Sequence, residues 1–198
     1  IWISSSTVYQ KKNKPIKEAE FDIKKPTYSI YRITGWVYRY IEELCKFYRE
    51  ELGMNISIIR TSSIYGPNDN FSEDKSHVVP ALIKKFLNQR KVDVWGSKNV
   101  IRDFVFVDDL VKAIFYISRK NFLTINFSNG KGTSILQLVN TLKKIFKNKN
   151  EIEFKNKKLS SVPYRVLDNS LFDNKVKKFN RTKLSIGLKK TIQWYKKN

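Results

Sequence analysis

Short strand-like runs alternate with longer helix-like segments along most of the 198-residue chain. The runs that read as strands are 1–4, 55–62, 92–95, 104–107, 124–128 and 151–154. The segments that favour a helix are 31–52, 78–88, 108–119, 134–146 and 183–195. Two parallel strands need a long crossover between them, which a helix usually supplies. The alternation therefore predicts parallel βαβ units and an α/β fold.

Only about three of these strands, 1–4, 55–62 and 104–107, are long core strands. That is few for a doubly wound sheet, in which each strand needs neighbours and helices cover both faces. The first strand begins at residue 1, with no preceding turn and no upstream partner strand. We therefore expect an incomplete sheet whose N-terminal part is missing from this sequence.

The formal net charge is +21, which is typical of proteins that bind nucleic acids. However, the lysines are spread along the chain, and no zinc-ligand or RNA-recognition pattern accompanies them. Lys, Asn and Ile are abundant together, as AT-rich codon usage would produce. We expect no nucleic-acid partner and no metal site, although a basic chain of this kind favours anionic ligands.

No apolar run is long enough to span a membrane, and no signal peptide is evident, so no membrane partner is expected. The single cysteine, Cys45, leaves no partner for an intrachain disulfide and is typical of a reducing compartment. The predicted localisation is cytoplasmic.

Several short motifs occur in a fixed order: ISSSTVY (3–9), IIRTSSIYGPND (58–69), WG (95–96), RDFVFVDDL (102–110) and GLKKTIQWY (187–195). Each is weak alone, but their order and spacing are specific. Together they resemble the extended short-chain dehydrogenase/reductase family of nucleotide-sugar epimerases and dehydratases. The stretch YGPNDNFSEDKSHVVPALIKKF (65–86) further resembles the GDP-L-fucose synthase branch.

The resemblance implies an incomplete Rossmann-type parallel sheet with a smaller C-terminal substrate-binding α/β region. Residues 1–66 and 101–128 would complete the dinucleotide-binding domain, and residues 67–100 and 129–198 would form the substrate-binding region. The implied activity is epimerisation or reduction at a keto or hydroxyl carbon of a nucleotide sugar, with NAD or NADP. The sequence contains no G-x-G-x-x-G or G-x-x-G-x-x-G loop, so the cofactor is expected only in a longer chain.

Five residues outside the long helix match family site positions: Ser5, Ser6, Ser63, His77 and Arg102. The resemblance implies that the Ser5 hydroxyl binds the reacting substrate oxygen, with Ser6 and Ser63 beside the substrate. His77 would donate a proton during epimerisation, and Arg102 would bind the diphosphate. The structural alternatives are a serine turn that caps a strand, a histidine at a helix start, and an Arg102–Asp103 ion pair. Asp108 or Asp109 is expected to cap the next helix.

The family's Tyr-x-x-x-Lys pair can be sought in two registers of the helix at 31–52. Tyr28 with Arg32 has a cation at the right spacing, but an arginine does not act as a lysine does. The preferred register is fixed by Glu42 and the helix end, and it places Thr34 at the tyrosine position and Tyr38 at the cofactor-contacting lysine position. Tyr31 lies one turn earlier and could supply a displaced catalytic hydroxyl.

Two function hypotheses follow. In the first, the protein is an enzyme in which Ser5 and His77 are retained and Tyr31 replaces the missing acid/base. In the second, it is a catalytically impaired relative that binds a nucleotide sugar or a protein partner. A homodimer through the helix at 31–52 is expected in either case.

Overall fold

The computed structural model describes residues 1–73, 75–119, 124–147, 150–155 and 162–198. The strands are β1 (Trp2–Ser5), β2 (Ile58–Thr61), β3 (Ser63–Tyr65), β4 (Lys91–Trp95), β5 (Ile101–Phe106), β6 (Thr124–Phe127), β7 (Gly132–Ser134), β8 (Glu151–Lys155) and β9 (Tyr164–Arg165). The α-helices are α1 (Arg32–Leu52), α2 (Val78–Asn88), α3 (Val107–Ser118), α4 (Ile135–Phe146), α5 (Ser170–Lys175) and α6 (Leu184–Lys197). Short 3-10 helices are η1 (Ser6–Val8), η2 (Glu18–Glu20) and η3 (Ser29–Tyr31). Within the described ranges, none of the helices has the length and apolar character needed to cross a membrane.

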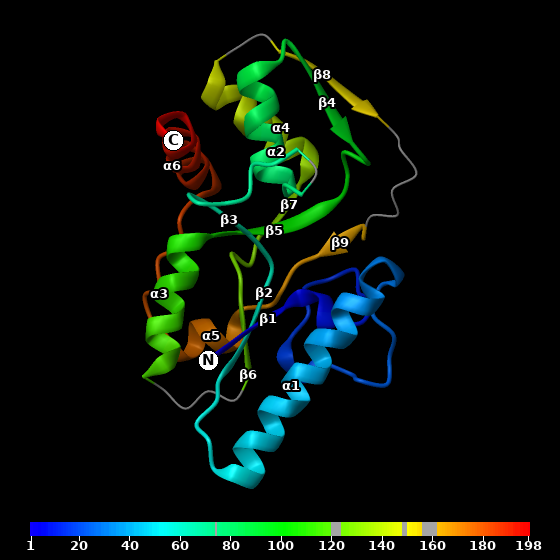
Figure 1. Cartoon of the computed structure of the whole chain (residues 1–198), viewed down its shortest axis with the longest axis vertical. Coiled ribbons are helices and arrows are strands. Elements are labelled where there is room, and N and C mark those ends of the chain that lie inside the picture. The colour runs from blue at the N-terminus through cyan, green and yellow to red at the C-terminus, as the bar shows by residue number, and fades with distance from the viewer. Residues whose placement is uncertain (74, 120–123, 148–149, 156–161) are drawn as a thin grey trace.

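A parallel sheet in the order β1-β2-β6 forms one part of the molecule. The helix α1 lies to one side of it, and α3 and α5 lie to the other (Figure 1). Ile59 of β2 and Ile125 of β6 pack with Leu110 of α3 and Phe172 of α5 in one buried cluster. This is the predicted arrangement, in which helices cover a parallel sheet.

The strand β5 links the β1-β2-β6 part to a second part, which contains α2, α4 and α6. It pairs with β3 and β9 in parallel and with β7 antiparallel, while β4 and β8 form a separate parallel pair. Because side chains alternate along a strand, Val105 joins the cluster under α3, whereas Phe104 and Phe106 join a cluster with α2, α4 and α6. These three helices lie close together in Figure 1. The division into two sequence-defined regions remains a prediction.

The long helix α1 is held tightly against the turn that follows β1. It ends at Leu52, and the C-cap residue Gly53 has a φ of +64°, the left-handed conformation common after helices. A Cβ at Gly35 would lie 2.7 Å from both Thr7 O and Thr27 Cγ2, so a glycine is needed for this close approach. The first turns of α1 are thereby brought beside the carboxyl end of β1.

A buried ion pair fixes the position of α1 over the sheet. Glu42 of α1 and Arg60 of β2 are 1% and 3% exposed, and Arg60 Nη2 lies 2.6 Å from Glu42 Oε2. Ser4 Oγ donates to Glu42 Oε1 at 2.5 Å, and Arg60 Nη1 donates to the Tyr9 hydroxyl oxygen at 3.0 Å. A buried charge without its partner is costly, so this network disfavours any other register of α1.

The predicted long helices and the main strands lie within a few residues of their expected bounds. The short elements β3, β7, β9 and α5 were not expected from the sequence. The predicted cap by Asp108 or Asp109 is wrong, because α3 begins at Val107 with Phe106 as its N-cap residue. Asp109 instead accepts hydrogen bonds from the backbone nitrogen (2.6 Å) and the hydroxyl (2.9 Å) of Thr182.

Candidate functional site

A cleft of about 500 Å³ opens at the carboxyl ends of β1 and β2. In open parallel α/β sheets, ligands bind at this edge. The cleft is also bounded by the first turns of α1, the start of α2, β5 and β9. The predicted site residues that line it are Ser5, Tyr31, Thr34, Tyr38, Ser63, His77 and Arg102. They come from five separate segments of the chain, which the fold brings to one place.

Ser6 is the predicted site residue that does not line the cleft. Its side chain is buried and lines a small cavity of about 20 Å³ with Tyr9 and Tyr28. Ser6 takes this position because the chain turns into η1 directly after Ser5. Its contact with a substrate stays a prediction.

Ser5 has a structural role and still borders the cleft. Its Oγ accepts a hydrogen bond from the Thr7 backbone nitrogen at 3.2 Å, so it caps η1, whereas the structural alternative was a serine turn that caps the strand. That bond occupies an acceptor position and leaves the hydroxyl proton for a ligand. Nearby, the Thr7 and Thr61 hydroxyls are buried without a described partner. Buried polar atoms of this kind are usually hydrogen-bonded, so unpaired hydroxyls at a cleft favour a polar ligand.

Thr34 and Tyr38 face the cleft, one helical turn apart on α1. Tyr38 also packs on the Trp2 ring at a centroid distance of 5.9 Å. In contrast, the Tyr28 hydroxyl donates to backbone oxygens of Lys12 (3.2 Å) and Tyr164 (3.3 Å), and it lines the small cavity instead. Thr34 and Tyr38 therefore line the cleft and Tyr28 does not, while the register of the Tyr-x-x-x-Lys pair stays a prediction.

Two guanidinium groups lie in the cleft wall. Arg102 shares a face of β5 with Phe104 and is about 9% exposed, and its Nη1 donates to the backbone oxygens of Ile101 (2.8 Å) and Val162 (2.6 Å). Burial, with the adjacent positive charge of Arg165, lowers the pKa of Arg102 to about 10, against the opposite influence of Tyr31 and Tyr28. Neither arginine forms an ion pair with a described carboxylate, so the proposed Arg102–Asp103 pair is not present.

Arg165 is the residue that the sequence reasoning missed. It lies on the two-residue strand β9, beside Arg102 in the β5–β9 ladder. Its guanidinium carbon is 4.9 Å from the Tyr31 ring centroid, and its Nη2 donates to Ser63 Oγ at 3.3 Å. The Arg165 Nε is buried without a described partner. Its only sequence signal is its place in VPYRVLD, a stretch too short to predict a strand.

His77 is the N-cap residue of α2, and its side chain is 80% exposed at the cleft. It makes no side-chain capping hydrogen bond to the helix, so its ring nitrogens are not used in helix termination. His77 therefore stands at a helix start, as the structural alternative stated. Its ring nitrogens make no hydrogen bond to the helix and can interact with a ligand.

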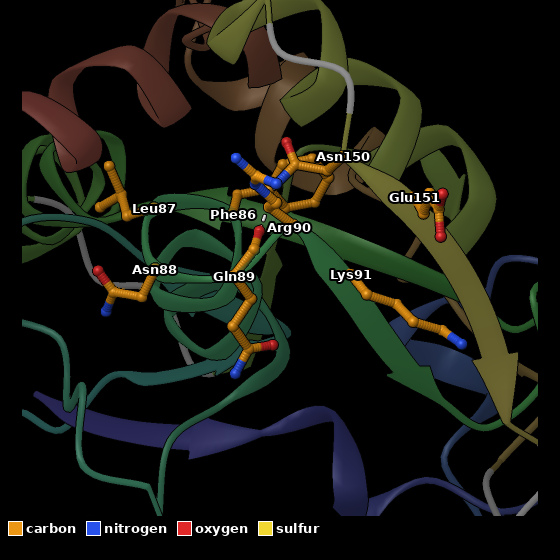
Figure 2. Close-up of a pocket in the computed structure, with 8 residues that line it drawn as sticks. All are labelled: Phe86, Leu87, Asn88, Gln89, Arg90, Lys91, Asn150 and Glu151. Atoms are coloured by element: carbon orange, nitrogen blue, oxygen red, sulfur yellow. Dashed lines mark hydrogen bonds between the residues drawn. The ribbon is translucent and has the colours of Figure 1, made fainter.

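A second hollow of about 680 Å³ lies at the end of α2, beside the starts of β4 and β8. Figure 2 shows that Leu87 and Asn88 point away from Asn150, while Lys91 and Glu151 lie on different strands. Its polar groups do not converge, unlike those of the cleft, and the hollow holds no predicted site residue. In the part of the chain that the structure describes, no cluster of His, Cys, Asp and Glu could hold a metal ion.

The profile of the NAD dependent epimerase/dehydratase family matches residues 1–126. The GDP-L-fucose synthase of Escherichia coli (strain K12) is 29% identical over 220 residues, covering 100% of this chain and 66% of that protein. GDP-L-fucose synthase 1 of Arabidopsis thaliana is 30% identical over 211 residues, covering 100% and 63%. The chain thus spans only 63–66% of the length of these curated relatives.

Solved structures support the same fold. A GDP-L-fucose synthetase from Naegleria fowleri bound to NADP has a TM-score of 0.88 at 22% identity, covering 99% of this chain and 63% of that one. A UDP-glucose 4-epimerase from Thermotoga maritima, solved with UDP-glucose, has a TM-score of 0.85 at 24% identity, covering 98% and 62%.

Proposed function

Because the chain belongs to the NAD dependent epimerase/dehydratase family, we propose that it works within a longer chain as a nucleotide-sugar epimerase or reductase. Its reaction would take place at a keto or hydroxyl carbon of the sugar, with NAD or NADP. Curated relatives include GDP-L-fucose synthases and a dTDP-4-dehydro-6-deoxy-D-allose reductase of Streptomyces. The observation that carries the proposal is the cleft, in which hydroxyl, imidazole and guanidinium groups converge.

Arg102 and Arg165 would bind the diphosphate of the nucleotide sugar. Both lie in the cleft wall, and neither is neutralised by a described carboxylate. Arg102 is buried and Arg165 is half-buried beside it, and two adjacent cations repel each other, so a bound dianionic group would remove a cost as well as form hydrogen bonds. Guanidinium groups also present paired donors that match phosphate oxygens.

Ser5 and Tyr31 would act at the reacting carbon of the sugar, Ser5 as a hydrogen-bond donor and Tyr31 as a proton donor. The Ser5 hydroxyl keeps its proton for a substrate oxygen, while Thr34 and Tyr38 stand where the family's acid and lysine are expected. Thr34 is a poor acid, so the phenol of Tyr31, in the same cleft and beside Arg165, is the substitute donor that we propose. Ser63 would contact the sugar, and His77 would exchange a proton with the carbon next to the carbonyl.

The nicotinamide end of NAD or NADP would lie against Ser5 and Tyr38. The unpaired hydroxyls of Thr7 and Thr61 fit a ligand with amide and ribose groups at this edge. The cofactor supplies hydride transfer, whereas the residues of this chain position the sugar and move protons. A cytoplasmic location fits a cofactor of this kind and the single cysteine, and we retain it as part of the proposal.

The alternative is a relative with impaired catalysis that still binds a nucleotide sugar. The observation that favours it is the pair Thr34 and Tyr38, because neither side chain can replace the ammonium group that normally assists the phenol. Under this alternative, Thr34→Tyr combined with Tyr38→Lys should create turnover that the unmodified protein lacks.

The deciding experiment uses the longer chain that contains this sequence. The oxidation of NADH or NADPH is followed optically with a panel of keto-sugar nucleotides. We expect turnover that falls roughly 100-fold or more in Tyr31→Phe, the range associated with loss of a general acid. Tyr28→Phe is the matched control and should keep its activity, because Tyr28 does not line the cleft. Bound cofactor without turnover of any sugar would contradict the enzyme proposal and support the alternative.

We also propose that two copies of the chain associate through α1. Ile33, Val37, Tyr40 and Phe47 are 51–77% exposed on this helix, and they follow the 4-3 spacing that apolar residues show in helix–helix seams. An exposed apolar stripe of this length is uncommon on an isolated surface helix and is typical of an interface.

A further inference from the structure

Asp69 lies next to the imidazole of His77 although the two residues belong to different elements. Asp69 is in the loop after β3, and His77 precedes α2. The His77 Nδ1 atom is 3.8 Å from Asp69 Oδ1, which is longer than a hydrogen bond. Because the His77 side chain is 80% exposed, a small rotation of its ring can close that gap without displacing packed neighbours.

The carboxylate is held more firmly than the imidazole. The Asp69 side chain is only 14% exposed, and its Oδ1 accepts the Asn70 backbone nitrogen at 2.8 Å. The Asp69 backbone nitrogen bonds Gly66 O at 3.4 Å, and farther along the loop Phe71 stacks on Tyr195 of α6 at 4.1 Å between ring centroids. The loop thus presents a fixed acceptor to a mobile ring.

One oxygen of this carboxylate has no described partner. Asp69 Oδ2 is buried and unpaired, whereas buried carboxylate oxygens usually accept hydrogen bonds. The nearby imidazole N–H is the donor that would satisfy the carboxyl group. The imidazole lies nearest to Oδ1, the other oxygen of the same carboxylate, so the unpaired acceptor and the 3.8 Å separation concern one carboxyl group through two different atoms.

We infer that Asp69 is a positioning residue for His77, which holds the neutral imidazole with its proton on Nδ1 and leaves Nε2 as the proton-exchanging atom. The two ring nitrogens are distinct, and a hydrogen bond at one sets the protonation of the other. With Nδ1 directed at Asp69, Nε2 would be the ring nitrogen left for a ligand in the cleft that His77 lines. The use of this nitrogen in epimerisation rests on the proposed function, whereas the tautomer does not.

The test takes advantage of His77 being the only histidine in the chain. Long-range ¹⁵N–¹H NMR of protein labelled at histidine, at a pH about 2 units above the usual histidine pKa, reports directly which nitrogen carries the proton. We expect mainly Nδ1–H in the unmodified protein, whereas free imidazole side chains favour Nε2–H. A proton mainly on Nε2 would overturn the inference without any variant.

Variants separate positioning from general structure. Asp69→Asn should shift the proton toward Nε2, and Asp69→Glu should restore at least part of the Nδ1–H form. Glu73→Gln is the matched control, because Glu73 is another carboxylate of this loop and pairs with Lys84 at 3.2 Å instead of His77. An unchanged tautomer in folded Asp69→Asn protein would overturn the inference. None of these spectra requires turnover. The tautomer can therefore be determined even if the protein proves to have no epimerase or reductase activity.

Discussion

Asp103 shows how one residue of the strand beside the cleft responds to burial. Its side chain faces away from Arg102 and accepts the backbone nitrogens of Asn129 (3.0 Å) and Gly130 (3.1 Å). The residue is 0% exposed, and burial raises its pKa to about 6, although these hydrogen bonds act in the opposite direction. The folded protein therefore binds this proton more tightly than the unfolded chain does.

We predict that the stability contributed by the Asp103 carboxyl group falls as pH rises. It should be complete below about pH 4, near the ordinary pKa of 3.8, and lost as pH passes through about 6. The difference between the ordinary and the raised pKa of Asp103 corresponds to about 3 kcal/mol. Urea unfolding of the unmodified protein and Asp103→Asn at pH 4 and pH 7 tests this. Relative to the variant, the unmodified protein should lose stability between these pH values. A constant difference would contradict the prediction.

Single residues of the site differed in how far the sequence could predict them. Ser5, His77 and Arg102 belong to motifs whose spacing is specific, and all three line the cleft. Thr34 and Tyr38 were predicted by counting back along a helix of fixed rise and turn; both line the cleft, and their match to the family's positions stays a prediction. Arg165 was not predicted because its position depends on a two-residue strand that forms only against β5.

At the level of elements, segments with strong local patterns were predictable and short ones were not. The helix α1 was expected from residue 31 to 52 and is found at Arg32–Leu52. The strand β7 was missed because its three residues pair antiparallel with β5 and carry no alternating pattern of their own. Such strands exist only through tertiary contacts, which local propensity does not contain. The expected aspartate cap of α3 failed for the same reason, since Thr182 binds Asp109 from a distant segment.

The close contact between α1 and η1 gives a prediction at this scale. Gly35→Ala should raise helix propensity by about 1 kcal/mol, yet its Cβ would meet Thr7 O and Thr27 Cγ2 at 2.7 Å. Because one of these atoms belongs to the backbone, we expect net destabilisation of about 1–3 kcal/mol, the usual cost of overpacking. Chemical denaturation measures it, with Glu51→Ala on the exposed end of the same helix as control. A more stable Gly35→Ala protein would show that the contact can relax.

In the whole molecule, the cleft lies between the part that contains the β1-β2-β6 sheet and the part that contains β5 and α2. One wall comes from the β1-β2-β6 sheet and α1, and the other comes from β5, β9 and the start of α2. The family resemblance implied which residues would meet there, but composition and periodicity alone predicted only an α/β fold. The distances that make the site useful, such as 4.9 Å from Arg165 to the Tyr31 ring, depend on how both parts pack.

The exposed stripe on α1 gives a prediction for the assembled protein. We expect a homodimer in which the two α1 helices pack against each other, so a charge placed within the stripe would be buried in both copies. Tyr40→Glu should weaken association by about 100-fold or more, since an unpaired buried charge costs at least about 3 kcal/mol.

Sedimentation analysis over a range of concentrations measures this association. Phe115→Glu is the matched control, because Phe115 is 63% exposed on α3 and Tyr40 is 65% exposed on α1. Both variants add one negative charge in place of an exposed aromatic ring, so net charge and solubility change equally. Only the α1 variant should become monomeric. An unmodified protein that is monomeric at about 100 µM, a concentration at which even weak specific dimers form, would contradict the predicted interface.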